Sequence, residues 1–377
     1  MSGFSVKAKA LYRQMRLAWR FVTHEEMRSS TSLGLRQRLA MLRLGFLSQT
    51  HELYNLKDYE LSDYFSDWAK ARMSMMYDAR NIRGGYQYGL NNKLFSTAIL
   101  GQYLRVPTIY AIIEHGQIVP LAPADQQVLR ETWIESCEAA GGTLVLKPSA
   151  DGRGRGVFML SLRDGALYLD DQSVTEEAVN NRIASLNEYI IVEFLRQGAF
   201  SAGLYPETTN TIRVVTVIDP DSGAPYLPIA VQRIGRLASR PVDNWNRGGL
   251  CAEVDFATGV LSRAASREGT ERRLSWYDTH PDTGLPIAGQ QVPDWDAVKT
   301  TILAAAARLA YFKFLSWDVV LLDHGIAIIE ADTVSGIETL QVHRPLLRDE
   351  RLRRFFAFHG YVSKEVNAAS ASTVNVG

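Results

Sequence analysis

Residues 317–332 read WDVVLLDHGIAIIEAD, in which two apolar, β-branched runs flank a short polar turn that ends in glycine. This pattern is typical of a β-hairpin. If residues 323–325 form the loop, Leu322 pairs with Ile326, and the ladder places Asp318 opposite Glu330. Asp332 follows two residues later and therefore lies on the same face of the hairpin as Glu330.

Asp318, Glu330 and Asp332 would then share one acidic patch. Like charges opposite each other destabilise a sheet, so the patch needs a counter-charge, and hard cations such as Mg²⁺ prefer oxygen ligands together with substrate phosphates. The alternative is a solvated hairpin edge that carries scattered acids. The almost wholly apolar runs favour strands buried on both faces, where unpaired acids are costly. We therefore predict that these three residues are metal ligands.

The composition is that of a soluble globular protein. The chain has 377 residues, 46% hydrophobic and 22% charged, with a formal net charge of zero, which allows two or three packed subdomains. No apolar run reaches the length of a membrane span, and the N-terminus does not resemble a signal peptide. Two cysteines form no disulfide framework or metal motif. We expect a cytoplasmic protein, and the neutral charge argues against general nucleic-acid binding.

Residues 1–80 read as an N-terminal helical region. Between residues 1 and 46, nine lysines and arginines stand against two glutamates, and Leu11, Met15, Ala18 and Val22 fall on one helical face. Such a helix binds a membrane surface or an anionic partner, or it packs on the main domain and leaves a basic face in water. We favour the packed helix, with peripheral membrane contact as the alternative. Residues 53–76 read as a second, aromatic-rich helical region that forms core.

A glycine-rich loop joins two predicted strands at residues 147–157, KPSADGRGRGV. In a Walker P-loop the lysine follows the glycines and opens a helix, whereas here Lys147 precedes them on a strand. Glycines allow backbone N–H groups to approach phosphate oxygens, and Lys147, Arg153 and Arg155 add positive charge. A plain hairpin turn needs fewer glycines. The loop therefore predicts phosphate contact.

Arg213 and Arg233 lie within two further β-branched strands. Arginines in such strands are rarely buried without a partner. Each therefore faces a bound anion or forms an internal salt bridge with one of the acids, and the sequence leaves both possibilities open.

In their order, these motifs resemble the ATP-grasp fold, and most closely the sugar-transfer-associated ATP-grasp family, which is related to α-L-glutamate ligases. The resemblance covers roughly residues 81–360. It implies an α+β fold with two subdomains that grip ATP, over residues 81–195 with a glycine-rich lid and over residues 196–362 with the metal hairpin. Residues 363–377 read as a disordered tail.

The resemblance also implies roles for individual residues. Lys93 matches the first phosphate-contacting lysine, and Lys147 the second. Glu193 to Leu195 match the hinge whose backbone meets adenine. Arg213 lies in the Asn210-Thr211-x-Arg213 signature, and Arg233 precedes Gly235 in another, with Val242-Asp243-Asn244 and Gly248-Gly249 following. The implied nucleotide-binding residues are Lys93, Lys147, Ser149, Gly152, Gly154, Gly156, Glu193, Phe194 and Leu195.

Two positions depart from the common ATP-grasp pattern. Asp332 stands where the third metal ligand is commonly asparagine, which adds a negative charge at the metal. Ser316 stands where some ligases carry an arginine that steadies the acyl phosphate, so Arg213 or Arg233 would take that catalytic role.

The activity implied by the resemblance is ATP-dependent joining of a small-molecule carboxylate to an amine through an acyl phosphate, with ATP and Mg²⁺. The setting would be cell-surface sugar or secondary-metabolite conjugation. A kinase acting on a small-molecule acceptor and a non-catalytic nucleotide-binding scaffold are the alternatives. The sequence indicates neither the substrates nor the oligomeric state.

Overall fold

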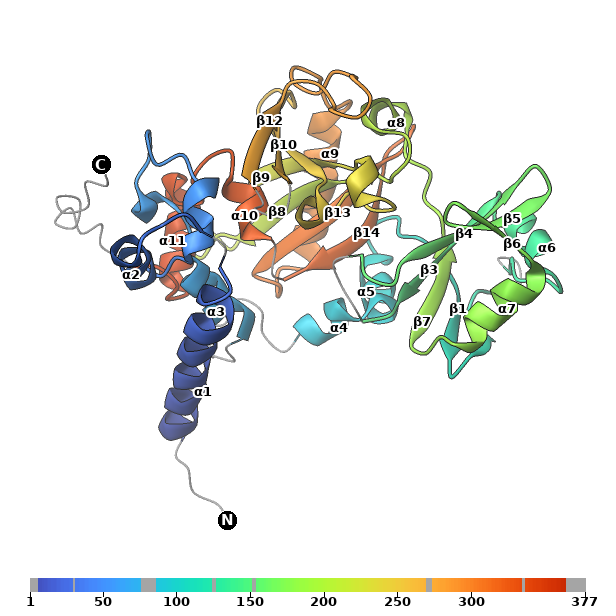
Figure 1. Ribbon diagram of the computed structural model, residues 1–377, viewed down its shortest axis with the longest axis horizontal. Helices are drawn as coiled ribbons and strands as arrows, with labels where there is room; N and C mark the ends of the chain where they lie inside the picture. The colour runs from blue at the N-terminus through green and yellow to red at the C-terminus, as the bar shows by residue number, and fades with distance from the viewer. Residues whose placement is uncertain are drawn as a thin grey trace, which may run out of the picture.

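The computed structural model describes residues 6–29, 31–75, 86–123, 127–150, 154–268, 273–333 and 336–363. In this part of the chain the strands form two seven-stranded, wholly antiparallel sheets. The sheets lie side by side, with the N-terminal helices at the far end of the second sheet (Figure 1). The fold is therefore α+β, as predicted.

The first sheet holds the strands of the predicted lid region. Helices α6 (Trp133–Ala139) and α7 (Glu176–Ala184) cover it, and side chains such as Cys137, Val179 and Ile191 form its core. Its strands, in spatial order, are β2 (Gln117–Pro120), β1 (Ile109–Glu114), β7 (Tyr189–Glu193), β3 (Thr143–Pro148), β4 (Phe158–Arg163), β5 (Ala166–Leu169) and β6 (Gln172–Val174).

The second sheet is the larger body of the molecule. Helix α9 (Trp295–Arg308) packs on one face, and α10 (Ile337–Gln341) and α11 (Glu350–Phe358) pack on the other. Its strands, in spatial order, are β12 (Arg273–Tyr277), β11 (Leu261–Glu268), β10 (Leu250–Val254), β9 (Pro225–Ile234), β8 (Ile212–Ile218), β13 (Phe314–Leu321) and β14 (Ile326–Asp332). The predicted boundary at residues 195/196 falls between the strands of the two sheets, and the division into subdomains stays a prediction.

Short helices complete the chain. Between the N-terminal region and the first sheet lie α4 (Gln87–Asn91) and α5 (Lys93–Leu100). The others are α8 (Ala199–Leu204), η5 (Leu237–Ser239), η6 (Trp245–Arg247) and η7 (Leu346–Arg348). Residues 364–377, predicted to be a disordered tail, lie outside the described residues.

The N-terminal region is helical but irregular. It contains α1 (Val6–Arg20), η1 (Phe21–Glu26), α2 (Leu35–Arg43), η2 (Ser48–Leu53), η3 (Leu61–Asp63) and α3 (Asp67–Met75). Among its described residues, which end at Met75, the second predicted helical region is an α-helix only over α3. Its core-forming character is confirmed, because Phe65 and Met73 are buried in one cluster with Val215 and Phe356 of the main body.

The face of α1 that was expected to pack on the main domain is exposed. Leu11 and Met15 are 59% and 64% exposed, whereas Leu17 and Phe21 are the buried contacts. The expectation of a packed apolar face is therefore wrong. In Figure 1, α1 projects from the body of the molecule. Within the described residues, every helix is too short or too polar to cross a bilayer.

The acidic hairpin forms with one correction to its register. Asp318 pairs with Glu330 as predicted, and Ser316 pairs with Asp332. At the loop end, however, Leu321 rather than Leu322 pairs with Ile326. The ladder shifts by one residue between Asp318 and Val319, and this β-bulge restores the predicted pairing at the acidic end.

Candidate active site

A cavity of about 900 Å³ lies between the two sheets and extends to the N-terminal helices. Its lining falls into three parts. The first sheet and α5 contribute two lysines and the glycine-rich loop, the second sheet contributes the arginines and acids, and α1, η1 and α3 close the far end. All the predicted site residues in the described part of the chain line it, except Ser149 and Gly156, which lie next to Pro148 and Arg155 of the lining.

Lys93 and Lys147 meet at the end formed by the first sheet. Asn92 caps α5 by accepting a hydrogen bond from Leu94 N at 3.0 Å, so Lys93 is the first residue of the helix. The Lys93 N–H donates to the carbonyl of Ser149 at 2.7 Å, which joins α5 to the start of the glycine-rich loop. The Lys93 and Lys147 side chains therefore come from two elements that the backbone holds together.

Both lysines are buried beside a carboxylate. They are only 8% and 7% exposed, and Lys93 Nζ lies 3.9 Å from Glu330 Oε1. Burial lowers the pKa of Lys147 to about 8; Glu330 opposes this shift and Lys93 adds to it. Buried ammonium groups are costly without anions, so this end of the cavity is suited to a strongly anionic ligand.

The glycine-rich loop approaches its surroundings closely. Gly154 and Gly156 have φ values of +67° and +68°, which favour glycine. A Cβ on Gly156 would lie 2.5 Å from the hydroxyl of Tyr189. The carbonyl of Gly154 accepts from Arg247 Nη1 at 3.3 Å, which links the loop to the second sheet's side of the cavity. Gly152 and Arg153 lie outside the described residues.

At the predicted adenine hinge, the Glu193 side chain is held by two partners. Its carboxylate accepts from Arg105 Nη2 at 2.7 Å and from the Thr108 N–H at 3.0 Å. Phe194 and Leu195 continue along the cavity wall. These contacts tie Glu193 to the segment around Arg105 and Thr108, and the contact of residues 193–195 with adenine stays a prediction.

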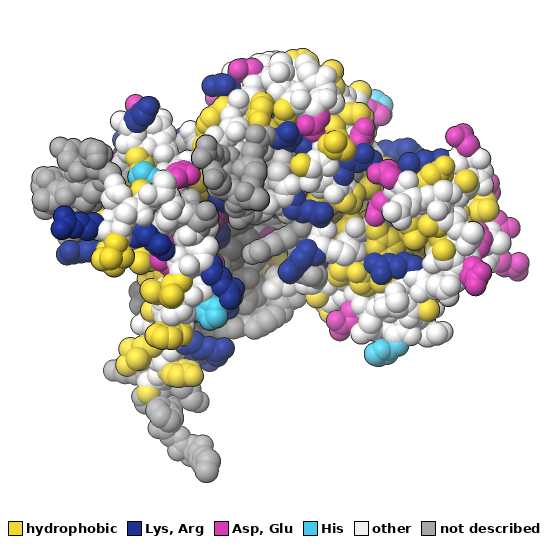
Figure 2. Space-filling model, in the orientation of Figure 1, with side chains coloured by type: hydrophobic (Ala, Val, Ile, Leu, Met, Phe, Trp, Pro, Cys, Tyr) yellow, Lys and Arg dark blue, Asp and Glu magenta, His cyan; other side chains and the backbone are white. Residues whose placement is uncertain are grey.

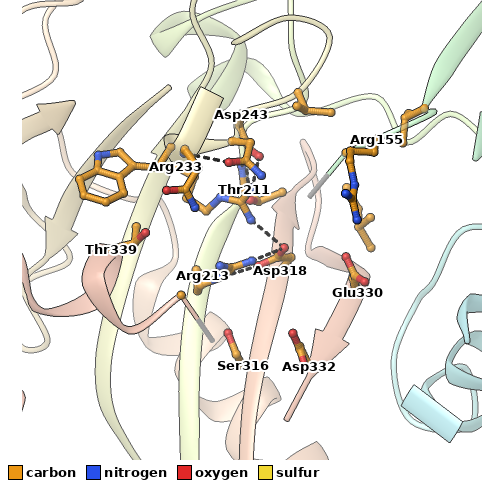
Figure 3. Close-up of a pocket in the computed structure, with 18 of the residues that line it drawn as sticks. Arg155, Thr211, Arg213, Arg233, Asp243, Ser316, Asp318, Glu330, Asp332 and Thr339 are labelled. Carbon is orange, nitrogen blue, oxygen red and sulfur yellow. Dashed lines mark hydrogen bonds and ion pairs between the residues drawn. The ribbon is translucent and has the colours of Figure 1, made fainter. Parts of the chain in front are cut away.

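Asp318 lies at the centre of the site, between two arginines (Figure 3). Arg213 donates to both Asp318 oxygens at 2.8 Å, and Arg233 Nη1 donates to Oδ2 at 2.7 Å. Burial alone raises the pKa of Asp318, but Arg213 and Arg233 outweigh it and lower the pKa to about 2. Of the two possibilities left open for the arginines, the structure contains the internal salt bridge.

Asp243 extends this network. Its carboxylate accepts from Arg233 Nη2 and, at 2.9 Å, from the Thr211 N–H. Burial raises the pKa of Asp243, and Arg233 opposes that shift. Asp243 appeared in the sequence only as part of a family signature, because nothing local to that loop indicates that its partner is a strand arginine.

The three predicted metal ligands lie on two neighbouring strands, and their role in binding a metal stays a prediction. Asp318 points toward Arg213 and Arg233, whereas Glu330 and Asp332 lie on the neighbouring strand (Figure 3). Across residues 6–363, apart from the undescribed gaps, no three His, Cys, Asp or Glu side chains are grouped so that they could hold a metal ion. Two carboxylates together with substrate phosphates are enough for Mg²⁺. Glu330 and Asp332 fit that donor set, and Asp318 fits it less well.

The far end of the cavity was not predicted from the sequence. There Lys70 forms a short ion pair with Glu338, and the buried Asp67 accepts from the Leu47 N–H at 2.8 Å. Burial, followed by the charge of Glu338, raises the pKa of Asp67 to about 7. These residues form no recognisable motif, and only the fold brings α3 next to α10.

The chain belongs to the sugar-transfer associated ATP-grasp family, whose model matches residues 73–353. This confirms the predicted family and the ATP-grasp fold. No curated protein matches the chain significantly.

Several solved structures are similar to this one. A D-alanine–D-alanine ligase from Bacillus anthracis is 12% identical with a TM-score of 0.39, and the match covers 78% of this chain and 74% of that one. An L-amino acid ligase from Bacillus licheniformis is 10% identical with a TM-score of 0.37, covering 72% and 46%. An N5-carboxyaminoimidazole ribonucleotide synthetase in complex with ADP is 12% identical with a TM-score of 0.36, covering 71% and 57%. This chain thus spans less than two thirds of the last two.

Proposed function

We propose that this protein is an ATP-dependent carboxylate–amine ligase that forms an amide through an acyl phosphate. The observation that carries the proposal is the pair of buried lysines, Lys93 and Lys147, beside Glu330 in a cavity between two sheets. Two buried ammonium groups near one carboxylate suit a triphosphate with its metal ion. Membership of the ATP-grasp family supports the same assignment.

In this proposal the first sheet binds the nucleotide. Lys93 and Lys147 contact the phosphates, and the glycine-rich loop, with Ser149, Gly152, Gly154 and Gly156, covers them. The segment Glu193, Phe194 and Leu195 contacts adenine. The Gly154–Arg247 hydrogen bond brings the loop over the second sheet's side of the cavity, where the reaction would take place.

Glu330 and Asp332 would hold Mg²⁺, which neutralises charge on the phosphates when it is bound. Asp318 acts mainly through Arg213 and Arg233: by fixing both guanidinium groups at the centre of the cavity, it orients them toward the reacting oxygens. Because Asp332 replaces the common asparagine, the site carries one more negative charge than usual.

The reaction has two steps. A substrate carboxylate oxygen attacks the γ-phosphorus, the bond from that phosphorus to the β,γ-bridging oxygen breaks, and ADP leaves with its electron pair. The amine then attacks the acyl carbon, the bond from that carbon to the phosphate oxygen breaks, and phosphate leaves as the nitrogen loses a proton. Positioning and charge neutralisation carry most of such a transfer. The cavity end at Lys70, Glu338 and Asp67 is the space for these substrates.

The test is a screen for substrate-dependent ADP release, with product mass as the readout. The family's association with sugar transfer makes sugars that bear carboxylate or amino groups the first substrates to try. Lys147→Met and Glu330→Gln should each abolish ADP release, whereas Lys57→Met, at an exposed lysine, should leave it unchanged.

Three results would contradict the ligase assignment. A stable phosphorylated product that forms without an amine would make the protein a kinase. ATP binding with no ADP release for any pair of substrates would make it a nucleotide-binding scaffold. Normal turnover by the Glu330→Gln protein would show that this site does not take part in the reaction.

A further inference from the structure

Helix α1 exposes an apolar stripe to solvent. The packed side of the helix is formed by Leu17, which is 4% exposed, and is continued by Phe21. A different side carries large apolar residues that recur every three or four positions and therefore form one stripe. Their exposed fractions are 59% for Leu11, 64% for Met15, 69% for Trp19 and 44% for Val22, with Tyr12 beside them at 66%. Isolated exposed apolar residues are ordinary, but an ordered stripe indicates a binding surface.

A basic strip runs beside the apolar stripe. Arg13, Arg16 and Arg20 are exposed and follow the same helical spacing on the side next to it. Arg16, Arg20 and Arg28 also line an open hollow of about 680 Å³ together with His24 and Trp19, and Glu25 and Gln49 complete its wall. In Figure 2 hydrophobic and basic side chains cover the projecting helix.

We propose that α1 and η1 dock on the surface of a lipid bilayer that contains anionic lipids. The stripe of Leu11, Met15, Trp19 and Val22 would enter the interface, and the arginines would contact lipid phosphates. An exposed apolar face beside a basic face, with Trp at the boundary, is the pattern of helices that lie in the plane of a membrane. At 15 residues, α1 is not among helices long and apolar enough to cross it.

Charge favours a bilayer over a second copy of the chain as the occupant. The whole chain has zero net charge, yet the first 46 residues carry nine basic side chains against two acidic ones. Two copies that pair through this surface would bring like charges together, whereas an anionic leaflet attracts each of them. The proposal does not depend on the ligase activity.

The experiment is co-sedimentation of the full chain with phosphatidylcholine vesicles, with and without phosphatidylglycerol. We expect the protein to pellet with the anionic vesicles and to be released by high salt. Met15→Ser/Trp19→Ser should weaken binding roughly tenfold or more, because it removes most of the apolar area that would insert. Arg13→Gln/Arg16→Gln should weaken it roughly fivefold for each arginine.

The controls are equally exposed residues elsewhere. Leu237→Ser, at a leucine that is 67% exposed, and Arg308→Gln/Arg354→Gln, at two exposed arginines, should bind the vesicles like the wild type. Circular dichroism and thermal unfolding should match for all variants, since none of the changed side chains is buried.

Three outcomes would overturn the proposal. The first is no pelleting with anionic vesicles, and the second is equal, salt-insensitive pelleting with neutral ones. The third is a dimer in light scattering that Met15→Ser/Trp19→Ser converts to a monomer while vesicle binding is absent, which would assign the stripe to self-association.

Discussion

Lys147 should make nucleotide binding sensitive to alkaline pH. Burial lowers the pKa of its ammonium group to about 8, so in the free protein the charge is present below pH 8 and is lost above it. Phosphate oxygens bind the charged form. The affinity for a non-hydrolysable ATP analogue should therefore fall above pH 8 by up to roughly tenfold per pH unit. Titration calorimetry from neutral pH to about pH 9.5 measures this directly, well above the phosphate ionisation near pH 6.

The control for Lys147 is Lys147→Arg. A guanidinium stays protonated throughout this range, so the affinity of the variant should be nearly constant with pH even if it is weaker overall. An equal alkaline decline in both proteins would assign the titration to another group.

Asp318 should contribute to the stability of the protein even when neither metal nor nucleotide is bound. Asp318→Asn removes the negative charge that Arg213 and Arg233 share; Arg233 keeps its ion pair with Asp243, but the part-buried guanidinium of Arg213 loses its carboxylate partner. The free energy of unfolding should fall by on the order of 3 kcal/mol. Denaturant unfolding with EDTA and no ATP measures this loss.

Asp332→Asn is the comparison for Asp318→Asn, because it retains both arginine contacts of Asp318. Its effect on unfolding should be clearly smaller. If Asp318→Asn were as stable as the wild type in EDTA, the carboxylate would be a metal ligand whose repulsion is relieved by the change, and its role as an arginine anchor would be wrong.

The partners of these residues show where sequence reasoning ends. Arginines within apolar strands indicate that counter-charges must exist. That Arg213 meets Asp318, however, follows from β8 lying directly beside β13, where the two residues are paired in register. Strands more than 90 positions apart in sequence acquire that register only in the folded sheet, so the sequence left the anion and the salt bridge equally open.

At the scale of the element, the absence of a side chain at Gly156 should allow the glycine-rich loop to cover the cavity. Gly156→Ala places a side chain at a φ of +68° and brings its Cβ within 2.5 Å of the Tyr189 hydroxyl. The backbone cost alone is about 1 kcal/mol. Because the loop covers the proposed phosphate site, we expect weaker ATP-analogue binding, by roughly tenfold, together with a modest fall in thermal stability.

Gly165→Ala separates strain from contact. Gly165 also has a positive φ, +76°, but a Cβ there would have no neighbour within 4 Å. That variant should bind the analogue normally. Adding Tyr189→Phe to Gly156→Ala should recover part of the affinity, and no recovery would place the effect in the backbone rather than in the contact.

The hairpin shows how far a local pattern predicts an element. The apolar runs and the glycine turn predicted the two strands and the Asp318–Glu330 pair. The loop is one residue longer than predicted, because Leu321 rather than Leu322 pairs with Ile326. A bulge next to Val319 compensates for this shift, so that Asp318 still pairs with Glu330. A bulge has no signature in these β-branched residues, and it depends on how β14 twists against its neighbour β13.

For the whole molecule, the family motifs predicted the ATP-grasp fold, but they did not predict how the N-terminal region joins it. Helical periodicity identifies an apolar face without saying what covers it, and on α1 the predicted face was the exposed one. Phe65, Ala69 and Met73, in contrast, complete the core beneath β8 and α11. Contacts between segments so far apart in sequence form only when their folded surfaces meet, and local sequence patterns therefore do not predict them.

Phe65 should therefore stabilise the whole fold rather than the N-terminal region alone. Its side chain is 1% exposed, and its ring lies 4.1 Å from that of Phe356 on α11. Phe65→Ala removes a buried aromatic ring and leaves a cavity, which should lower the free energy of unfolding by about 4 kcal/mol. Phe358→Ala, at a ring that is 56% exposed on the same helix α11, should cost less than about 1 kcal/mol. Because the core is shared, the main thermal transition of the Phe65→Ala protein should shift as one unit. A separate early transition, with the main one unmoved, would show that residues before the family-matched region unfold independently of the two sheets.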